Sequence, residues 1–180
     1  LSRLSGGSLD TAANLTAGAR EFARMNNIPV AQLMGDVAGA TEEFALFGRE
    51  GGKNIIEAAG AAAKLGTNMS TLSGIAEGLL DFENSITKEL ELSAMLGKNI
   101  NLNRARGLAY EGDIVGATKE TLNQLGGIDA FNRMDYFQKK QTAALLGVSV
   151  AELQKMADGQ ERMNKMTQLT NGSWSGLTEG

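Results

Sequence analysis

Few residues of this sequence are of a type that could carry out chemistry. Its 180 residues include no cysteine and no histidine. That composition excludes a thiolate nucleophile, a zinc–thiolate site and the imidazole proton shuttle of Ser–His or Cys–His catalysis. Paired carboxylates such as Glu42 and Glu43 could act as acid and base in a sugar-cleaving site only if a cleft held them across the scissile bond. Nothing in the sequence marks such a cleft, so we expect solvated helix faces and no catalytic residue.

The sequence also argues against a phosphate-binding loop, a nucleic-acid-binding surface and a membrane span. The glycine-rich stretch GREGGKN (Gly48–Asn54) lacks the Gly-Lys-Ser/Thr ending of a phosphate loop and follows an expected helix instead of a strand. The net charge is −4, and Lys139 and Lys140 form the only adjacent basic pair, whereas phosphate neutralisation needs clustered basic residues. No apolar run reaches the roughly 18 residues of a membrane span. We therefore expect no metal, no cofactor, no specific nucleic acid and no stable membrane span in this segment.

An apolar stripe is the clearest candidate for protein interaction. Its residues are spaced by three and four positions, which places them on one face of a helix. They are Leu72, Ile75, Leu79, Phe82, Ile86 and Leu90. The spacing predicts one amphipathic helix within residues 70–96, the longest in the chain. Such a stripe either faces the protein's own core or forms an oligomeric coiled-coil seam, and fewer than three heptads cannot decide between the two.

A second candidate is a methionine-rich face on the last expected helix. Met156, Met163 and Met166 recur at helical spacing. Methionine is flexible and suits surfaces that repack against a partner, but it also fills irregular gaps in cores. Both interpretations remain open from the sequence, and the first makes these residues protein-interaction candidates.

The elements that must position these residues are predicted to be helices. Alanine and leucine far outnumber β-branched residues, and Pro29 is the only proline. We expect an all-α fold without a sheet, an array of short helices and helical hairpins around the longer amphipathic helix. Seven to nine helices are expected. Their approximate spans are 9–25, 29–47, 53–65, 70–96, 101–111, 114–125, 128–146 and 150–169.

Glycine patterns divide the chain. Residues 1–52 are expected to form a flexible lead-in and an N-terminal helical hairpin that ends at a hinge, Gly48, Gly51 and Gly52. Residues 53–169 form the main helical segment, and residues 170–180 form a tail or a connection to further sequence. The spacing of Gly74 and Gly78 is that of close helix packing, although 23 glycines make chance matches common.

The main helical segment resembles a known family. The likeness is strongest in LDFENSITKELELSAMLGKNINLNRARGLAYEGD (Leu80–Asp113) and continues in LGGIDAFNRMDYFQKKQTAALLGVSVAELQKM (Leu125–Met156). These residues resemble the tail tape measure proteins of tailed bacteriophages. The resemblance covers about residues 53–169 and includes no catalytic signature.

The resemblance implies a structural role inside a virion. Members of the family are long helical proteins that lie inside the phage tail, set tail length during assembly and leave ahead of the DNA at genome ejection. Implied partners are further copies of the chain, in three- or six-fold arrangement, and proteins of the tail tube and of the tail tip or baseplate hub. This chain is far shorter and begins with Leu1, so we expect a fragment. Because it lacks a long heptad run, it would be a jointed part and not the measuring rod.

Composition favours the same function independently. Helices rich in alanine and glycine are slim, and 5% aromatic residues suit a chain that must later unfold and pass through a channel. The alternative is an all-helical protein-binding or adaptor module whose hairpins hold a peptide. A third interpretation is a carboxylate-based hydrolase acting on cell wall, for which no matching residues are found. Turnover of peptidoglycan would distinguish the third from the first two.

Overall fold

The helical prediction is confirmed by a computed structural model, which describes residues 9–42 and 53–175. These two stretches contain ten helices and no strand. The expected lead-in at residues 1–8, the end of the second helix near Phe47, and the hinge at Gly48, Gly51 and Gly52 lie outside the described residues. The helices that surround the candidate interaction residues can therefore be followed from 53 to 175 without a gap.

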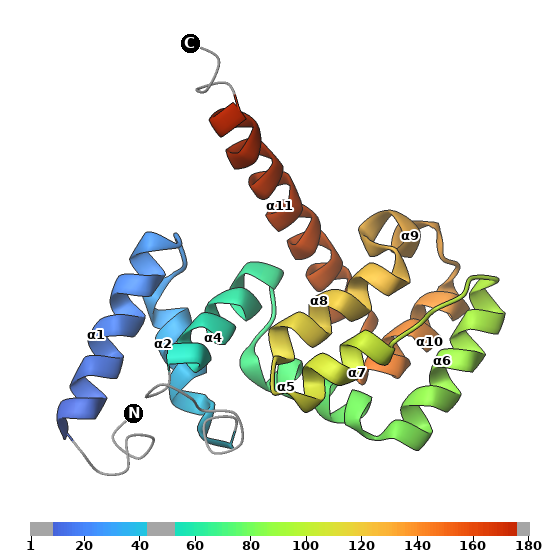
Figure 1. Cartoon of the computed structure of the whole chain (residues 1–180), viewed down its shortest axis with the longest axis horizontal. Helices are drawn as coiled ribbons and strands as arrows, with labels where there is room; N and C mark the ends of the chain where they lie inside the picture. Colours follow the sequence, from blue (N-terminus) through green and yellow to red (C-terminus); the bar gives the residue numbers. More distant parts are fainter. Residues whose placement is uncertain (1–8, 43–52, 176–180) are drawn as a thin grey trace.

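Three helices form one end of the molecule (Figure 1). They are α1 (Leu9–Met25), α2 (Val30–Gly39) and α4 (Lys53–Leu65), and each packs against the other two. The turn between α1 and α2 uses Asn27 at φ 53°, a left-handed conformation that asparagine tolerates. Pro29 then occupies the position before the first residue of α2, where a missing N–H costs nothing.

The span predicted as one long helix is two helices. They are α5 (Met69–Leu80) and α6 (Phe82–Leu96), separated at Asp81. The backbone N–H of Asp81 donates to Glu77 O (3.1 Å) at the end of α5, while its carboxylate accepts from the N–H of Asn84 (3.4 Å) at the start of α6. One residue thus ends one helix and caps the next, a role that aspartate fills well. The prediction of an uninterrupted helix over 70–96 is wrong for this reason.

A second predicted helix is also divided. Residues 128–146 form α9 (Gly127–Arg133) and α10 (Tyr136–Leu146), while α7 (Asn103–Tyr110) and α8 (Ile114–Leu125) match the expected spans closely. Asp135 and Gln138 form a reciprocal capping box that starts α10. The two divided spans explain why the described residues contain more helices than the seven to nine expected.

The longest helix is the last one. Helix α11 runs over Val150–Ser175, and Ser149 and Glu152 form a capping box at its start. Its first half packs against α4, α9 and α10, and its second half extends away from the other helices (Figure 1). Residues 170–175, within the span expected as a tail or a connection to further sequence, continue this helix; residues 176–180 lie outside the described part.

Helix α5 lies at the centre of the larger helical group. It packs against α4, α6, α7, α8 and α10. Leu72 and Ile75 are fully or almost fully buried there, as are Leu122 of α8 and Leu153 of α11. Burial of large aliphatic side chains is the main favourable contribution to such a fold, roughly 1.5–3 kcal/mol for each one.

The spacing of Gly74 and Gly78 does not mark a site of close helix packing, which occurs at other glycines. An added Cβ at either position would meet nothing within 4 Å. At Gly159 of α11 it would lie 2.6 Å from backbone atoms of Leu65, so this glycine lets α11 and α4 approach closely. Gly60 has a similar role, because a Cβ there would lie 2.3 Å from the ring of Phe22.

Within the described ranges, the model contains no helix with both the length and the apolar character that a membrane crossing requires.

Candidate interaction surface

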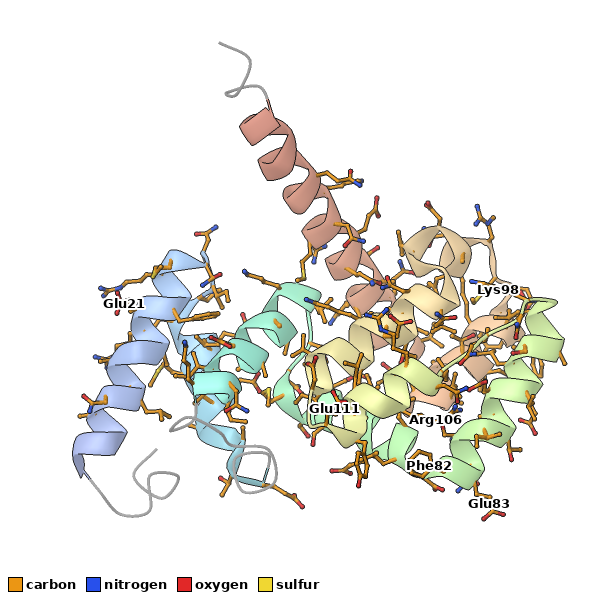
Figure 2. The ribbon with its side chains drawn as sticks, viewed as in Figure 1. Glu21, Phe82, Glu83, Lys98, Arg106 and Glu111 are labelled. Carbon is orange, nitrogen blue, oxygen red and sulfur yellow. The ribbon has the colours of Figure 1, made fainter. Side chains whose placement is uncertain are left out.

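Three apolar side chains lie in a row on the outer face of α6. Phe82, Ile86 and Leu90 are 50%, 46% and 65% exposed and follow each other at four-residue intervals. We call this row the α6 ridge. Figure 2 shows Phe82 and its neighbour Glu83 at the start of α6, at the periphery of the molecule. Isolated exposed apolar residues are common, but an aligned row is the usual mark of a contact surface.

The other predicted interaction residues whose side chains are described are buried or half-buried. Leu72, Ile75 and Leu79 are buried in the chain's own core. Met156 is fully buried and Met163 is half-buried against the core, whereas the side chain of Met166 lies outside the described residues. The first half of the stripe thus faces the protein's own core, one of the two interpretations that the sequence left open, and Met156 likewise fills the core. The sequence pattern was continuous, but the break at Asp81 changes which way the stripe faces.

The inward face of α6 is set by different residues. Ser85 and Leu92 are the buried positions of this helix, and Glu89 lies between them with only part of its side chain exposed. Successive residues of an α-helix are rotated by about 100°, so Ser85, Glu89 and Leu92 share one face of α6. The α6 ridge lies on one flank of that face. A face with two polar side chains needs polar partners in the core, and these come from α7.

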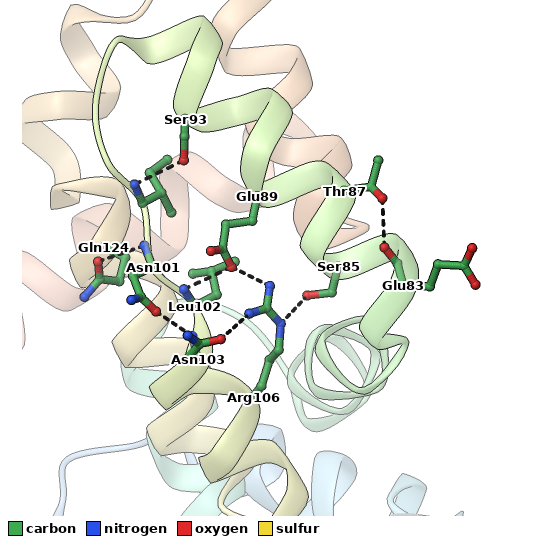
Figure 3. Close-up of polar contacts among 11 residues, drawn as sticks. Glu83, Ser85, Thr87, Glu89, Ser93, Asn101, Leu102, Asn103, Arg106 and Gln124 are labelled. Carbon is green, nitrogen blue, oxygen red and sulfur yellow. Dashed lines mark hydrogen bonds and ion pairs between the residues drawn. The ribbon is translucent and has the colours of Figure 1, made fainter.

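Arg106 of α7 provides those partners. It is 4% exposed, and its guanidinium forms an ion pair with the carboxylate of Glu89. Its Nε donates to Ser85 Oγ (3.0 Å), and its Nη1 donates to Asn103 Oδ1 (2.9 Å). Figure 3 shows the Arg106 side chain reaching from α7 to both α6 residues. A buried charge is tolerated when it is paired and hydrogen-bonded in this way.

The loop between α6 and α7 is fixed by the same group of side chains. The N–H of Leu102 donates to Glu89 Oε2 (3.2 Å), and the N–H of Ile100 donates to Ser93 Oγ (3.1 Å). Lys98 donates to the carbonyl oxygen of Gln124 (2.7 Å), which connects the loop to α8. These bonds hold α6 on α7 in one orientation (Figure 3), and the ridge residues remain exposed.

The sequence analysis missed this polar cluster, although a signal was present. Leu102, Ala105, Arg106 and Ala109 share one face of the expected helix at spacings of three and four. Arg106 is thus a charged residue on an apolar face, a position that calls for a buried partner. The sequence did not indicate that the partner is Glu89, since 17 residues separate the two.

A groove lies on the other flank of α6, where this helix meets α10. It has a volume of about 290 Å³. Its lining combines apolar side chains with a few polar ones at the rim. The lining residues are Lys88, Glu91, Leu92, Met95, Phe137, Gln141, Ala144 and Leu145. Phe137 is 59% exposed at this edge, and we call the depression the α6–α10 groove.

A second hollow is lined in part by carboxylates. It measures about 450 Å³ and is lined partly by Glu57, Glu111 and Asp113. The carboxylate of Asp113 accepts from the N–H of Gly116 (2.8 Å) and so caps α8. In the described stretches, no three Asp, Glu, His or Cys side chains gather in a way that could hold a metal ion.

The described surface therefore defines a helical protein with an exposed apolar ridge and an adjacent groove. The chain matches no protein-family model, no curated protein and no solved structure at a significant level.

Proposed function

We propose that the chain is a structural segment of a bacteriophage tail tape measure protein. In this role it lies inside the virion tail, contacts the tail tube and the tail tip or baseplate hub, contributes to setting tail length and is released at genome ejection. The proposal rests on the likeness of Leu80–Asp113 to that family. It assigns no catalytic activity to the chain.

The arrangement of this same stretch supports the proposal. Leu80–Asp113 contains α6, α7 and the cluster around Arg106, which together present the α6 ridge to the outside. A structural protein acts through surfaces that hold other chains, and the ridge is such a surface on a firmly held helix. The short helices between 53 and 146 also agree with a jointed part of a tape measure protein instead of a continuous rod.

Virion composition tests the proposal directly. Tailed phage particles induced from the source strain are purified, tails are separated from heads, and peptides are identified by mass spectrometry. We expect peptides from residues 53–175 in the tail fraction and their loss from particles after genome ejection. Absence of these peptides from purified tails would overturn the proposal.

The alternative is a helical adaptor module that holds a peptide of another protein. The α6–α10 groove is the observation that favours it, because an apolar depression beside an exposed aromatic ring suits a peptide side chain. Cross-linking in cells followed by mass spectrometry separates the two functions. Cross-links to tail tube or hub proteins agree with the tape measure proposal, whereas cross-links confined to proteins absent from virions favour the adaptor.

A further inference from the structure

A buried side-chain oxygen of α11 has no hydrogen-bond partner. Gln160 is 6% exposed, and its Oε1 is the one atom, among the buried side-chain nitrogen and oxygen atoms of the described residues, that makes no hydrogen bond. Its Nε2 donates to Asn123 Oδ1 (2.6 Å) and to the carbonyl oxygen of Lys119 (3.3 Å), both on α8. A carbonyl oxygen can only accept, so the carboxamide cannot be turned to exchange its two polar atoms. Oε1 therefore needs a donor other than these α8 groups.

Gln160 lines a hollow where α11 passes α8 and α9 (Figure 1). We call it the α9–α11 hollow. Its volume is about 350 Å³, about ten times the roughly 30 Å³ of one water molecule. Its polar side chains are carboxamides and carboxylates, namely Asn123, Asp129, Gln160, Glu161 and Asn164. Among the described residues that line it, none is a lysine or an arginine. A ligand with several N–H donors would thus meet acceptors on three helices.

The α9–α11 hollow has a surplus of negative charge. Asp129 and Glu161 are its two carboxylates, and Lys165, one turn further along α11, pairs with Glu161. The hydrogen bond and the charge of Glu161 raise the pKa of Lys165, and the charge of Asp129 adds to this effect, so both carboxylates act on the same region. Lys98 does not line the hollow, and its ammonium donates to the carbonyl oxygen of Gln124. Because Lys165 offsets only one carboxylate, one negative charge is left for a cationic ligand.

We propose that the α9–α11 hollow binds an alkylguanidinium group, the head group of an arginine. A guanidinium has five N–H donors in one rigid plane, so it can donate to Gln160 Oε1 and pair with the carboxylate of Asp129 at the same time. An ammonium is a compact point charge that is more strongly hydrated, and it fits this spread of acceptors less well. The inference goes beyond the proposed function and does not rest on it, since the site can exist whether or not the chain is found in virion tails.

Titration of the whole chain with N-acetyl-arginine amide tests the site. The side-chain NH₂ signals of Gln160 and Asn164 are followed by nuclear magnetic resonance at constant ionic strength. We expect saturable shifts with a dissociation constant of about 10 mM or tighter. The citrulline analogue has almost the same shape and no charge, and it should bind at least about tenfold more weakly; the lysine analogue should also bind more weakly.

The same titration distinguishes the two sources of the head group. Free arginine is titrated in parallel with N-acetyl-arginine amide. Tighter binding of the amide indicates an arginine residue within a protein chain, and tighter binding of free arginine indicates the amino acid itself. Absence of saturable shifts up to about 50 mM of either probe overturns the inference and indicates that water alone satisfies Gln160 Oε1. Equal binding of the citrulline analogue overturns it as well, because charge is then not recognised.

Two variants locate the binding. Gln160→Met removes the unpartnered oxygen with little change in length, and Asp129→Asn removes one charge with little change in shape. Each should weaken binding of N-acetyl-arginine amide by about fivefold or more. Asp158→Asn is the matched control, because Asp158 lies on α11 outside the hollow and accepts from Gln154. Should Gln160→Met fold poorly, as judged by circular dichroism, the exposed Asp129 still provides the test. Unchanged affinity in Asp129→Asn, or an equal loss in Asp158→Asn, overturns the inference.

Discussion

At the scale of single residues, the buried charge of Arg106 is the most consequential feature. Its removal leaves Ser85 without its partner and leaves the Glu89 carboxylate with the N–H of Leu102 but no positive charge. We expect Arg106→Leu to lower the free energy of unfolding by about 3 kcal/mol, measured by urea denaturation. The double variant Arg106→Leu/Glu89→Leu should recover much of that loss, since no unpaired charge remains.

An exposed ion pair on α4 provides the control for this prediction. Lys53 and Glu57 lie 3.9 Å apart there. Lys53→Ala should change stability by less than about 0.5 kcal/mol because solvent screens such pairs. A double variant at Arg106 and Glu89 that loses as much as the two single variants together would contradict the account of a coupled buried pair.

A second residue-scale prediction concerns two glycines with opposite expected effects. Gly159→Ala places a Cβ 2.6 Å from the backbone of Leu65 and should destabilise the chain by about 1–3 kcal/mol. Gly78→Ala adds a methyl group in open space on an exposed helix face and should stabilise it by about 0.5–1 kcal/mol. Thermal denaturation of both variants provides the measurement. The same sign for both changes would show that backbone approach at Gly159 is less close than the structure indicates.

At the scale of an element, the start of α11 should depend on pH. Hydrogen bonds from the backbone N–H and the hydroxyl of Ser149 lower the pKa of Glu152. A carboxylate with a lowered pKa in the folded state stabilises that state above its unfolded pKa, near 4.3, and the contribution disappears as the pH falls through the folded pKa. We therefore expect the first turn of α11 to loosen in acid.

Nuclear magnetic resonance titration of the Glu152 side chain and the Ser149 amide measures this effect. In Ser149→Ala the pKa of Glu152 should return part of the way toward its ordinary value, because the hydroxyl donor is lost while the backbone N–H remains. An unchanged pKa in Ser149→Ala would show that the hydroxyl contributes nothing and that the backbone N–H of residue 149 causes the shift.

At the scale of the whole molecule, stability should be graded along the chain. Helix α5 packs against five other helices, whereas α1 contacts only α2 and α4 among the principal packing pairs, and the second half of α11 extends away from the fold. We expect amide hydrogen exchange to be slowest in α5 and α8, and fastest in α1, α2 and the second half of α11. Uniform exchange across all helices would contradict this and favour one fully cooperative unit.

The division of residues 70–96 into two helices changes the exchange expected there. One amphipathic helix over this span, as the sequence predicts, would exchange slowly throughout. The structure leaves the outer face of α6 exposed at Phe82, Ile86 and Leu90, so α6 should exchange faster than α5. A helix with one exposed apolar flank has fewer buried contacts to lose when it opens.

The helical class and many helix boundaries could be read from local sequence. Gly97, Gly126 and Gly147 adopt positive φ at helix ends, and Ser149 and Glu152 cap the start of α11. These features depend on residues within one turn of each other, so a linear sequence contains all the information they need. Composition likewise excluded thiolate and imidazole chemistry without reference to a fold.

Tertiary packing decided the properties that matter for the candidate surface. Asp81 could have continued a helix, but the packing of α5 at the centre and of α6 against α5 and α10 favours the break that its carboxylate caps. That break buries Leu79 and exposes Phe82, although the two continue one sequence pattern. The pairing of Arg106 with Glu89 and the approach of Gly159 to Leu65 join residues far apart in the chain. Hydrophobic periodicity specifies which residues share a face of a helix, whereas the direction of that face depends on contacts between helices.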